Sequence, residues 1–419
     1  MTSTTTTPEV PIAGPATPLA PVRGADRLFS LDVVRGFAVL GILAVNAMTF
    51  AHPYQVVSNT TLQPGGFEGD AVMAWQVMHV FFEDKMRTLF SMLFGASIFL
   101  IGGERSDKPR GRLLRSRLFW LAIFGAVHGA AFWFGDILLL YAWTGLFVML
   151  ARSWSARRLL IVGVVLNLVC SALYVAMMMS LQFAPAEALA QAKQGSGWLS
   201  DPSAVQALYE RFQGGALETT QAAFQTWLSV APMMVIFFMP ATAALMLIGM
   251  GLFKAGYFAG RSPTWVYLLF IALGAGALWL IWGESESIVA GGFQFLDMMV
   301  KPVNSFLAPF ASLGYAAILI LLGRFGARLL LHPLASAGRM AFTNYLTQTL
   351  IMTTLFYGGR GLGWYGEYGW PEMWTIIGAV WLVQLIWSPL WLAKFSMGPL
   401  EWLWRCLTYR RWVPITRTA

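Results

Sequence analysis

Charged side chains are scarce in this 419-residue sequence, where they make up only 11% of the residues. Soluble globular domains carry roughly a quarter. Hydrophobic residues reach 57%, and the mean hydropathy is +0.62. These values exclude an ordinary soluble domain and indicate a helical protein that crosses a membrane several times.

Cysteine and histidine are also scarce. The two cysteines, Cys170 and Cys406, lie far apart and form no Cys-x-x-Cys pattern, which excludes a disulfide framework and a cysteine zinc site. Four histidines are too few for a histidine-rich metal centre. We therefore expect no metal site and no permanently bound cofactor.

Long apolar segments dominate the rest of the chain and predict an all-α polytopic fold with about ten transmembrane helices. We expect a disordered tail over residues 1–27, which are rich in Thr, Pro and Ala, rather than a signal peptide. The transmembrane domain would cover residues 28–408, with a polar external loop at about 182–220 and a basic cytoplasmic tail at 409–419. The apolar segments lie at approximately 33–51, 75–101, 113–134, 136–151, 157–181, 221–252, 264–283, 305–323, 339–357 and 370–393.

The basic residues are divided unequally between the two sides that these segments define. If the N-terminus is cytoplasmic, 22 of the 28 Lys and Arg residues fall on the cytoplasmic side. Only Lys193, Arg211, Lys301 and Arg360 fall on the other side. This positive-inside pattern predicts that both termini are cytoplasmic. The net charge of +8 then reflects topology, so we expect a lipid bilayer and no nucleic acid as partner.

Four charges interrupt the second apolar segment, in the stretch "FFEDKMRTLF". Glu83 precedes Arg87 by one helical turn, which predicts an ion pair, while Asp84 and Lys85 lie on neighbouring faces. Charges at this depth cost several kcal/mol each unless they are paired or hydrated. One interpretation is a self-neutralising pair or an amphipathic lead-in to a shorter span. We favour a polar intramembrane site, with Asp84, Lys85 and Arg87 as substrate-binding residues.

His128 and Asp136 are the predicted catalytic residues, separated by a turn at Gly135. A carboxylate one hairpin away could orient the imidazole and raise its basicity. The alternative is a hydrogen-bonded core histidine. His79 remains open as another base, and Asn46, in the first segment, is a further predicted substrate-binding residue.

Polar side chains also lie in the ninth segment and near the cytoplasmic surface. Asn344 and Gln348 share one helical face, and they fit either substrate contact or hydrogen bonding between helices. Arg35 and Arg339 fit either topological anchors or a site for the phosphates of acyl-CoA.

Several stretches closely resemble the YeiB family of bacterial inner-membrane proteins. They are "LDVVRGFAVLGILAVN", "KMRTLFSMLFGASI", "HGAAFWFGDILLLY", "GRMAFTNYLTQTLIMTTLFY" and "GPLEWLWR". The resemblance covers nearly the whole chain after about residue 28, with a YeiB-type C-terminal half at about 221–408. It implies a multi-pass protein of the bacterial inner membrane.

A more distant resemblance links the first two segments to two families of transmembrane acyltransferases. The Arg35-Gly36 pair with Asn46 is similar to the opening of the heparan-glucosaminide N-acetyltransferase-like proteins, and the acyltransferase-3 proteins typically have His at the position of Asn46. Asp84 falls where the first family carries an aspartate. Val57 stands where its catalytic histidine aligns without gaps, so the resemblance does not supply the base.

Two functions follow as expectations. The first is a transmembrane acyltransferase that moves an acyl group from cytoplasmic acyl-CoA, its co-substrate, to an envelope glycan, lipid or small molecule at the outer face. The second is a transporter that uses the intramembrane charges to bind a small molecule. A purely structural subunit would tolerate neutralisation of Lys85 and Arg87. A homodimer is compatible with the sequence.

Overall fold

The computed structural model describes residues 28–63, 66–198 and 201–416. Within them the chain is helical, and the one β interaction is an isolated bridge between Phe395 and Thr416. The predicted all-α membrane fold is confirmed. The tail predicted over residues 1–27 lies outside the described residues.

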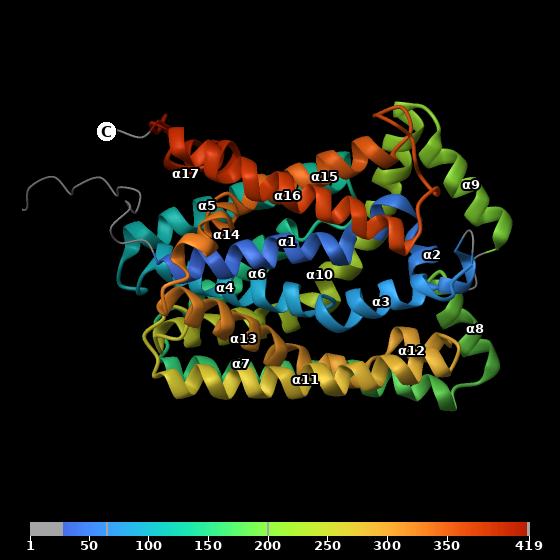
Figure 1. Cartoon of the computed structure of the whole chain (residues 1–419), viewed down its shortest axis with the longest axis horizontal. Coiled ribbons are helices and arrows are strands. Elements are labelled where there is room, and N and C mark those ends of the chain that lie inside the picture. The colour runs from blue at the N-terminus through green and yellow to red at the C-terminus, as the bar shows by residue number, and fades with distance from the viewer. Residues whose placement is uncertain (1–27, 64–65, 199–200, 417–419) are drawn as a thin grey trace, which may run out of the picture.

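The long helices run side by side along the longest axis of the molecule (Figure 1). In this view α1 lies between a layer that contains α7, α11 and α13 and a layer that contains α15 and α16. The α-helices are α1 (Phe29–Ala51), α2 (Tyr54–Ser58), α3 (Asp70–Phe81), α4 (Lys85–Gly102), α5 (Lys108–Ala131), α6 (Leu138–Val148), α7 (Ala156–Ser180), α8 (Ala186–Gly195), α9 (Pro202–Gln213), α10 (Ala216–Lys254), α11 (Thr264–Ala290), α12 (Phe295–Met299), α13 (Pro302–Arg324), α14 (Arg328–Arg339), α15 (Ala341–Phe356), α16 (Trp370–Lys394) and α17 (Pro399–Tyr409).

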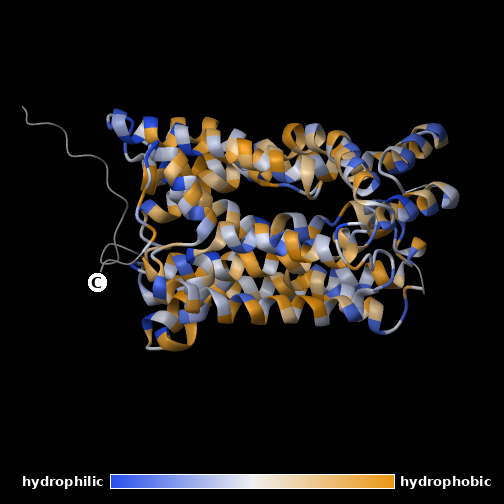
Figure 2. Cartoon of the chain, turned by 90° about the horizontal axis from the view of Figure 1, so that it is seen from above, coloured by the Kyte–Doolittle hydropathy of each residue, from blue (hydrophilic) through white to orange (hydrophobic). Residues whose placement is uncertain are grey.

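The two ends of the bundle differ in composition. One end, called the basic end below, holds the α4–α5, α6–α7, α10–α11 and α13–α14 connections, together with α17 (Figure 1). The residues in or next to these connections include Arg110, Arg152, Lys254 and Arg324. The other, called the loop end, holds α2, α8, α9 and α12 (Figure 1). Hydrophilic residues gather at both ends, and hydrophobic residues predominate along the helices between them (Figure 2).

Each of the ten predicted apolar segments contains a helix. Seven helical stretches of the described part are long and apolar enough to cross a membrane by length and composition. They are Phe29–Ala51, Asp70–Gly102, Ala156–Phe183, Ala216–Lys254, Thr264–Ala290, Phe295–Arg324 and Trp370–Lys394. The other three segments correspond to α5, whose first half is rich in arginine, and to the shorter helices α6 and α15.

Burial separates the central helices from the peripheral ones. In the most apolar window of each stretch, 72% of the residues are buried for α1 but only 11% for α7 and 22% for α11. Because α7 and α11 expose apolar side chains outward, they are suited to face lipid. α1 therefore forms the core around which the other helices pack.

Close backbone contact joins α1 to α14 and α4 to α10. A Cβ atom at Gly36 would overlap the backbone of Leu334, and one at Gly338 would overlap the carbonyl of Asp32. Gly95 and Gly249 meet the facing backbones of α10 and α4 in the same way. Small residues allow such approach between membrane helices, where van der Waals packing drives association. These crossings fix the positions of α1 and of α4, and α4 carries two of the charged residues described below, Lys85 and Arg87.

Gly338→Ala should therefore destabilise the protein, because the added methyl group overlaps the α1 backbone at Asp32. We expect the free energy of unfolding to fall by about 1–3 kcal/mol, as it does at other over-packed sites. The measurement is thermal unfolding of the purified protein in detergent. Gly276→Ala on α11 is the matched control, since nothing lies within 4 Å of the added Cβ there. Equal melting temperatures for the two variants would contradict the close-contact account.

Candidate functional site

The second predicted segment is not one helix, and this corrects the expectation of a continuous span over 75–101. α3 ends at Phe81 and α4 begins at Lys85. The amides of Phe82 and Glu83 both donate to the carbonyl of Met78, each at 2.9 Å. Asp84 has φ +61°, a left-handed conformation that is uncommon for a residue other than glycine. The charged stretch therefore lies at a break between two helices.

The break changes the predicted ion pairing. The expected Glu83–Arg87 pair does not form, because the two residues no longer lie one turn apart on one helix. Arg87 Nη2 instead contacts Asp84 Oδ1 at 2.8 Å. Glu83 accepts hydrogen bonds from Lys301 Nζ, at 2.8 and 2.9 Å, and from Nδ1 of His79.

Lys85 closes the end of α3. Its side chain is fully buried, and Nζ donates to the carbonyl of His79 at 2.8 Å and to Oδ1 of Asn304 at 2.5 Å. The last carbonyls of a helix lack partners within it and carry partial negative charge. A lysine ammonium satisfies such a carbonyl and is itself stabilised by it. Lys85 therefore compensates for the backbone bonds that the break removes.

Asn304 links the break to α13. Its Nδ2 donates to Oδ2 of Asp84 at 3.1 Å, while its Oδ1 accepts from Lys85. Glu284, on α11, holds the first turn of α13, because its carboxylate accepts hydrogen bonds from the backbone amides of Val303 and Asn304 at 2.7 and 2.9 Å. A carboxylate at a helix N-terminus also interacts favourably with the helix dipole.

The break network, defined by the charged residues Glu83, Asp84, Lys85, Arg87, Glu284 and Lys301 with Asn304, is balanced in charge. Three carboxylates face three cations. An unpaired charge within the bilayer is costly. Charged residues are tolerated there when they pair and form hydrogen bonds with one another, so that the set is neutral as a whole. The charges of the stretch "FFEDKMRTLF" are therefore neutralised by partners within the network, as the interpretation of a self-neutralising pair predicts in part.

A cavity of about 320 Å³ borders this network, as the second interpretation requires. Its polar wall includes Glu83, Asp84 and Lys301. Its other lining residues are mainly aromatic and aliphatic: Val45, Tyr54, Val57, Trp75, Met78, Tyr174, Met298, Met299 and Trp370, with Thr49, Ser58 and Ser305. Since α2 supplies part of the lining, the cavity extends toward the loop end. A few polar groups on an apolar wall are typical of small-molecule sites.

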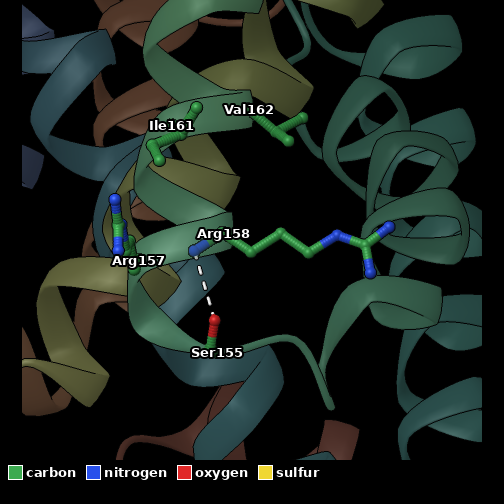
Figure 3. Close-up of a pocket in the computed structure, with 5 residues that line it drawn as sticks. All are labelled: Ser155, Arg157, Arg158, Ile161 and Val162. Atoms are coloured by element: carbon green, nitrogen blue, oxygen red, sulfur yellow. Dashed lines mark hydrogen bonds between the residues drawn. The ribbon is translucent and has the colours of Figure 1, made fainter.

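A second cavity, of about 230 Å³, lies at the start of α7 at the basic end. Ser155, Arg157, Arg158, Ile161 and Val162 line it, and the Arg158 side chain extends away from α7 (Figure 3). Ser155 Oγ accepts the Arg158 amide at 3.3 Å, as a helix cap does. None of the predicted site residues lines this cavity.

His128 and Asp136 are in contact, as the sequence predicts. His128 Nδ1 lies 2.8 Å from Asp136 Oδ1, and both side chains are buried. The amide of Leu139 donates to Asp136 Oδ2 at 2.9 Å, which fixes the carboxylate at the start of α6. The other ring nitrogen of His128, Nε2, lies 2.9 Å from the hydroxyl of Thr349 on α15.

One aromatic side chain connects this group with the cavity near the break. The ring of Trp133 lies 6.4 Å from that of His128, measured between centroids. Its Nε1 donates to the carbonyl of Thr49 at 3.4 Å, and Thr49 lines the 320 Å³ cavity. Trp133 also stacks on Phe50, with 4.2 Å between ring centroids. Trp133 thus contacts both His128 and a residue that lines the cavity.

Asn344 and Gln348 form hydrogen bonds between helices. Asn344 Nδ2 donates to the carbonyl of Ala337 and to Oγ of Ser388, both at 3.1 Å. Gln348 Nε2 donates to Oε1 of Gln384 at 2.9 Å and to a carbonyl of α1. Both side chains are buried, so the geometry supports the hydrogen-bonding interpretation.

Asn46 belongs neither to the break network nor to the set formed by His128, Asp136 and Thr349. It is half-buried on α1, and its backbone carbonyl accepts a hydrogen bond from Thr49 at 2.7 Å.

Arginines gather at the basic end. Arg35 contacts Asp32 at 3.1 Å and Ser97 at 3.4 Å, whereas Arg339 donates to the carbonyl of Ser396 at 3.2 Å. Arg117 stacks on Trp404, 3.8 Å from the ring centroid, and lies close enough to Arg35 and Arg405 for their charges to repel.

The other histidines have separate roles. His79 stacks on Trp75, with 5.1 Å between ring centroids, and contacts Glu83. His52, the residue after α1, is buried between Tyr209 (2.8 Å) and the carbonyl of Tyr368 (2.7 Å), and burial lowers its pKa. His332 is exposed on α14.

Four polar residues of these groups escape the sequence reasoning. For Lys301 the positive-inside pattern predicts only a place on the outer side, although its separation from the other cations in the sequence is a usable signal. Asn304, Glu284 and Thr349 carry no signal of their own. Each gains its role from a partner more than 200 residues away or on another helix, which local spacing does not reveal.

Comparison with known proteins places these features in a family. Residues 251–411 match a family described as "Protein of unknown function (DUF418)". The chain is 32% identical to "Uncharacterized protein YeiB" of Escherichia coli (strain K12) over 413 residues, covering 94% of this chain and 100% of that protein. It is 31% identical to "Uncharacterized protein YxaH" of Bacillus subtilis (strain 168), covering 95% of this chain and 98% of that protein. No solved structure matches.

Replacing Lys85 should show what the break network contributes to stability. Lys85→Met leaves the His79 carbonyl and Asn304 without their donor and leaves the carboxylates in excess. Each buried polar group that loses its partner costs about 1–3 kcal/mol. We expect thermal unfolding in detergent to occur at a clearly lower temperature, while Lys108→Met, at an exposed position, leaves it unchanged. If Lys85→Met unfolded at the same temperature as Lys108→Met and the wild-type protein, the stabilising role of Lys85 would be contradicted.

Proposed function

The chain belongs to the YeiB family, and we propose that this membrane protein is an acyltransferase. It takes the acyl group of a cytoplasmic acyl-CoA and transfers it to a hydroxyl or amine of an envelope glycan, lipid or small molecule at the outer face of the bacterial inner membrane. The basic end of the bundle would face the cytoplasm, in agreement with the positive-inside pattern.

The buried Asp136–His128 pair is the observation that carries this proposal. A carboxylate on Nδ1 holds the imidazole in the tautomer whose Nε2 accepts a proton, and it stabilises the imidazolium that results. In this protein the contact measures 2.8 Å, and a hydroxyl already lies 2.9 Å from Nε2. This is the geometry that an imidazole needs to deprotonate a hydroxyl.

The acyl donor would bind at the basic end. Guanidinium groups pair with phosphate oxygens through two parallel hydrogen bonds. We assign the phosphates of acyl-CoA to Arg35 and Arg339, joined by Arg117 and Arg405, whose charges lie near that of Arg35. The acyl-pantetheine arm would then extend along α1 toward His128.

The acceptor would bind in the 320 Å³ cavity near the loop end. Asp84 and Glu83 can accept hydrogen bonds from its hydroxyl or amine groups, and the aromatic wall suits the apolar face of a sugar or a lipid. Asn46 lies on the same helix as the lining residues Val45 and Thr49. Lys85 and Arg87 hold the shape of this wall, because they fix Asp84 through Asn304 and directly.

Transport is the second candidate, and the helix break favours it. Discontinuous membrane helices with charged residues at the break form the substrate sites of many transporters. The break network and its cavity would then bind a small molecule that passes through the bundle. This alternative gives the His128–Asp136 pair no chemical role.

Turnover of labelled acetyl-CoA separates the two candidates. Purified protein with a mixed envelope extract as acceptor should release free CoA and form a labelled product. His128→Ala should lower the rate about 100- to 10,000-fold, the usual contribution of a general base, and Asp136→Asn should also lower it. His332→Ala, at an exposed position, is the matched control and should retain the full rate.

Two outcomes would overturn the enzyme proposal. One is full activity of the His128→Ala variant, which would remove the proposed base. The other is the absence of turnover together with counterflow of a small molecule in proteoliposomes, which would establish the transport function.

A further inference from the structure

Thr349 occupies the position of a nucleophile beside the His128–Asp136 pair. We propose that its hydroxyl attacks the acyl thioester and carries the acyl group as a covalent ester before the acceptor receives it. The inference rests on the proposed function and adds to it an intermediate on a residue that sequence reasoning did not single out.

The hydroxyl of Thr349 is directed differently from those of its neighbours on α15. Thr347, Thr353 and Thr354 donate to backbone carbonyls three or four residues earlier, at 3.0, 2.8 and 2.7 Å. This is the usual behaviour of threonine within a helix. Thr349 Oγ1 instead lies 2.9 Å from His128 Nε2 on α5. The helix therefore does not use this hydroxyl for its own backbone.

The partners of His128 assign the direction of the hydrogen bonds. Because the Asp136 carboxylate only accepts, His128 Nδ1 carries the proton and Nε2 accepts from Thr349. The carboxylate is fixed in turn by the Leu139 amide. Carboxylate, imidazole and hydroxyl thus stand in the order that activates a serine or threonine nucleophile on unrelated folds.

The reaction would proceed in two balanced steps. Thr349 Oγ1 attacks the thioester carbonyl while its proton moves to His128 Nε2. The carbon–sulfur bond breaks, and the CoA thiolate takes the proton from the imidazolium, which leaves free CoA and a threonine ester. An acceptor hydroxyl or amine then gives its proton to Nε2 and attacks the ester, and Thr349 leaves as the hydroxyl once the imidazolium returns that proton.

Burial of the group suits such an intermediate. His128 is 3% exposed and Thr349 1% exposed. Exclusion of water from an active site prevents hydrolysis of reactive intermediates. Trp133 lies between His128 and the Thr49 wall of the cavity, so its displacement would admit the acceptor from that side. We therefore expect the ester to accumulate when acyl-CoA is present and the acceptor is absent.

The test is mass spectrometry of the full chain after incubation with acetyl-CoA alone. The wild-type protein should gain the mass of one acetyl group, and peptide sequencing should place it on Thr349. Thr349→Ala and the isosteric Thr349→Val should give no acetylated protein, whereas Thr349→Ser should retain it. Thr353→Ala is the matched control, since Thr353 lies one turn away and donates to the Thr349 carbonyl.

The outcomes distinguish this inference from the proposed function. Acyl transfer to an acceptor at the native rate by folded Thr349→Val, or acetylation at Cys170 or Lys85, would overturn the nucleophile while the acyltransferase proposal stands. A complete lack of acetyl-CoA turnover by the wild-type protein, with acceptor present, would overturn both. Thermal unfolding of each variant identifies any that fail to fold, and Thr349→Val preserves the volume of the side chain for this purpose.

Discussion

The cost of holding charge between apolar helices is the constraint on which this structure depends. Glu83 and Asp84 lie between α3 and α4, and Lys85 and Arg87 lie in the first turn of α4. The stretch around them is otherwise apolar enough to cross a membrane. The protein meets the cost by ending α3 early, which releases a backbone carbonyl for Lys85 and separates Glu83 from Arg87. Lys301, just before α13, and Asn304, in its first turn, then complete the pairing.

This arrangement connects helix packing with chemistry. Glycines at the α1–α14 and α4–α10 crossings bring these backbones into close contact, and the second crossing fixes α4, which carries Lys85 and Arg87 of the break network. The break network then forms one wall of the cavity, and α1 supplies another through Val45 and Thr49. Trp133 joins that wall to His128. The proposed acceptor site and the proposed base are thus linked through contacts of Trp133.

Much of the fold follows from the sequence, and the site follows only in part. Apolar length located all ten helical segments, since each span must satisfy its own backbone in lipid. The His128–Asp136 contact was predictable because a short turn joins its two residues. The break at Asp84 was not, because its partner Asn304 lies on α13, 220 residues further along the chain. Thr349, more than 200 residues from His128, is found only when the helices are placed.

The central claim is that mutual neutralisation of charges holds the break, and the half-buried pair of Glu83 and Lys301 offers its most direct test. The measurement is a double-mutant cycle of thermal stability in detergent with Glu83→Gln, Lys301→Met and the combined variant. Each single change leaves one charge without its partner, whereas the combined change removes both. The account predicts that the combined variant loses less stability than the sum of the single variants, by about 0.5–3 kcal/mol. Strictly additive losses would contradict it.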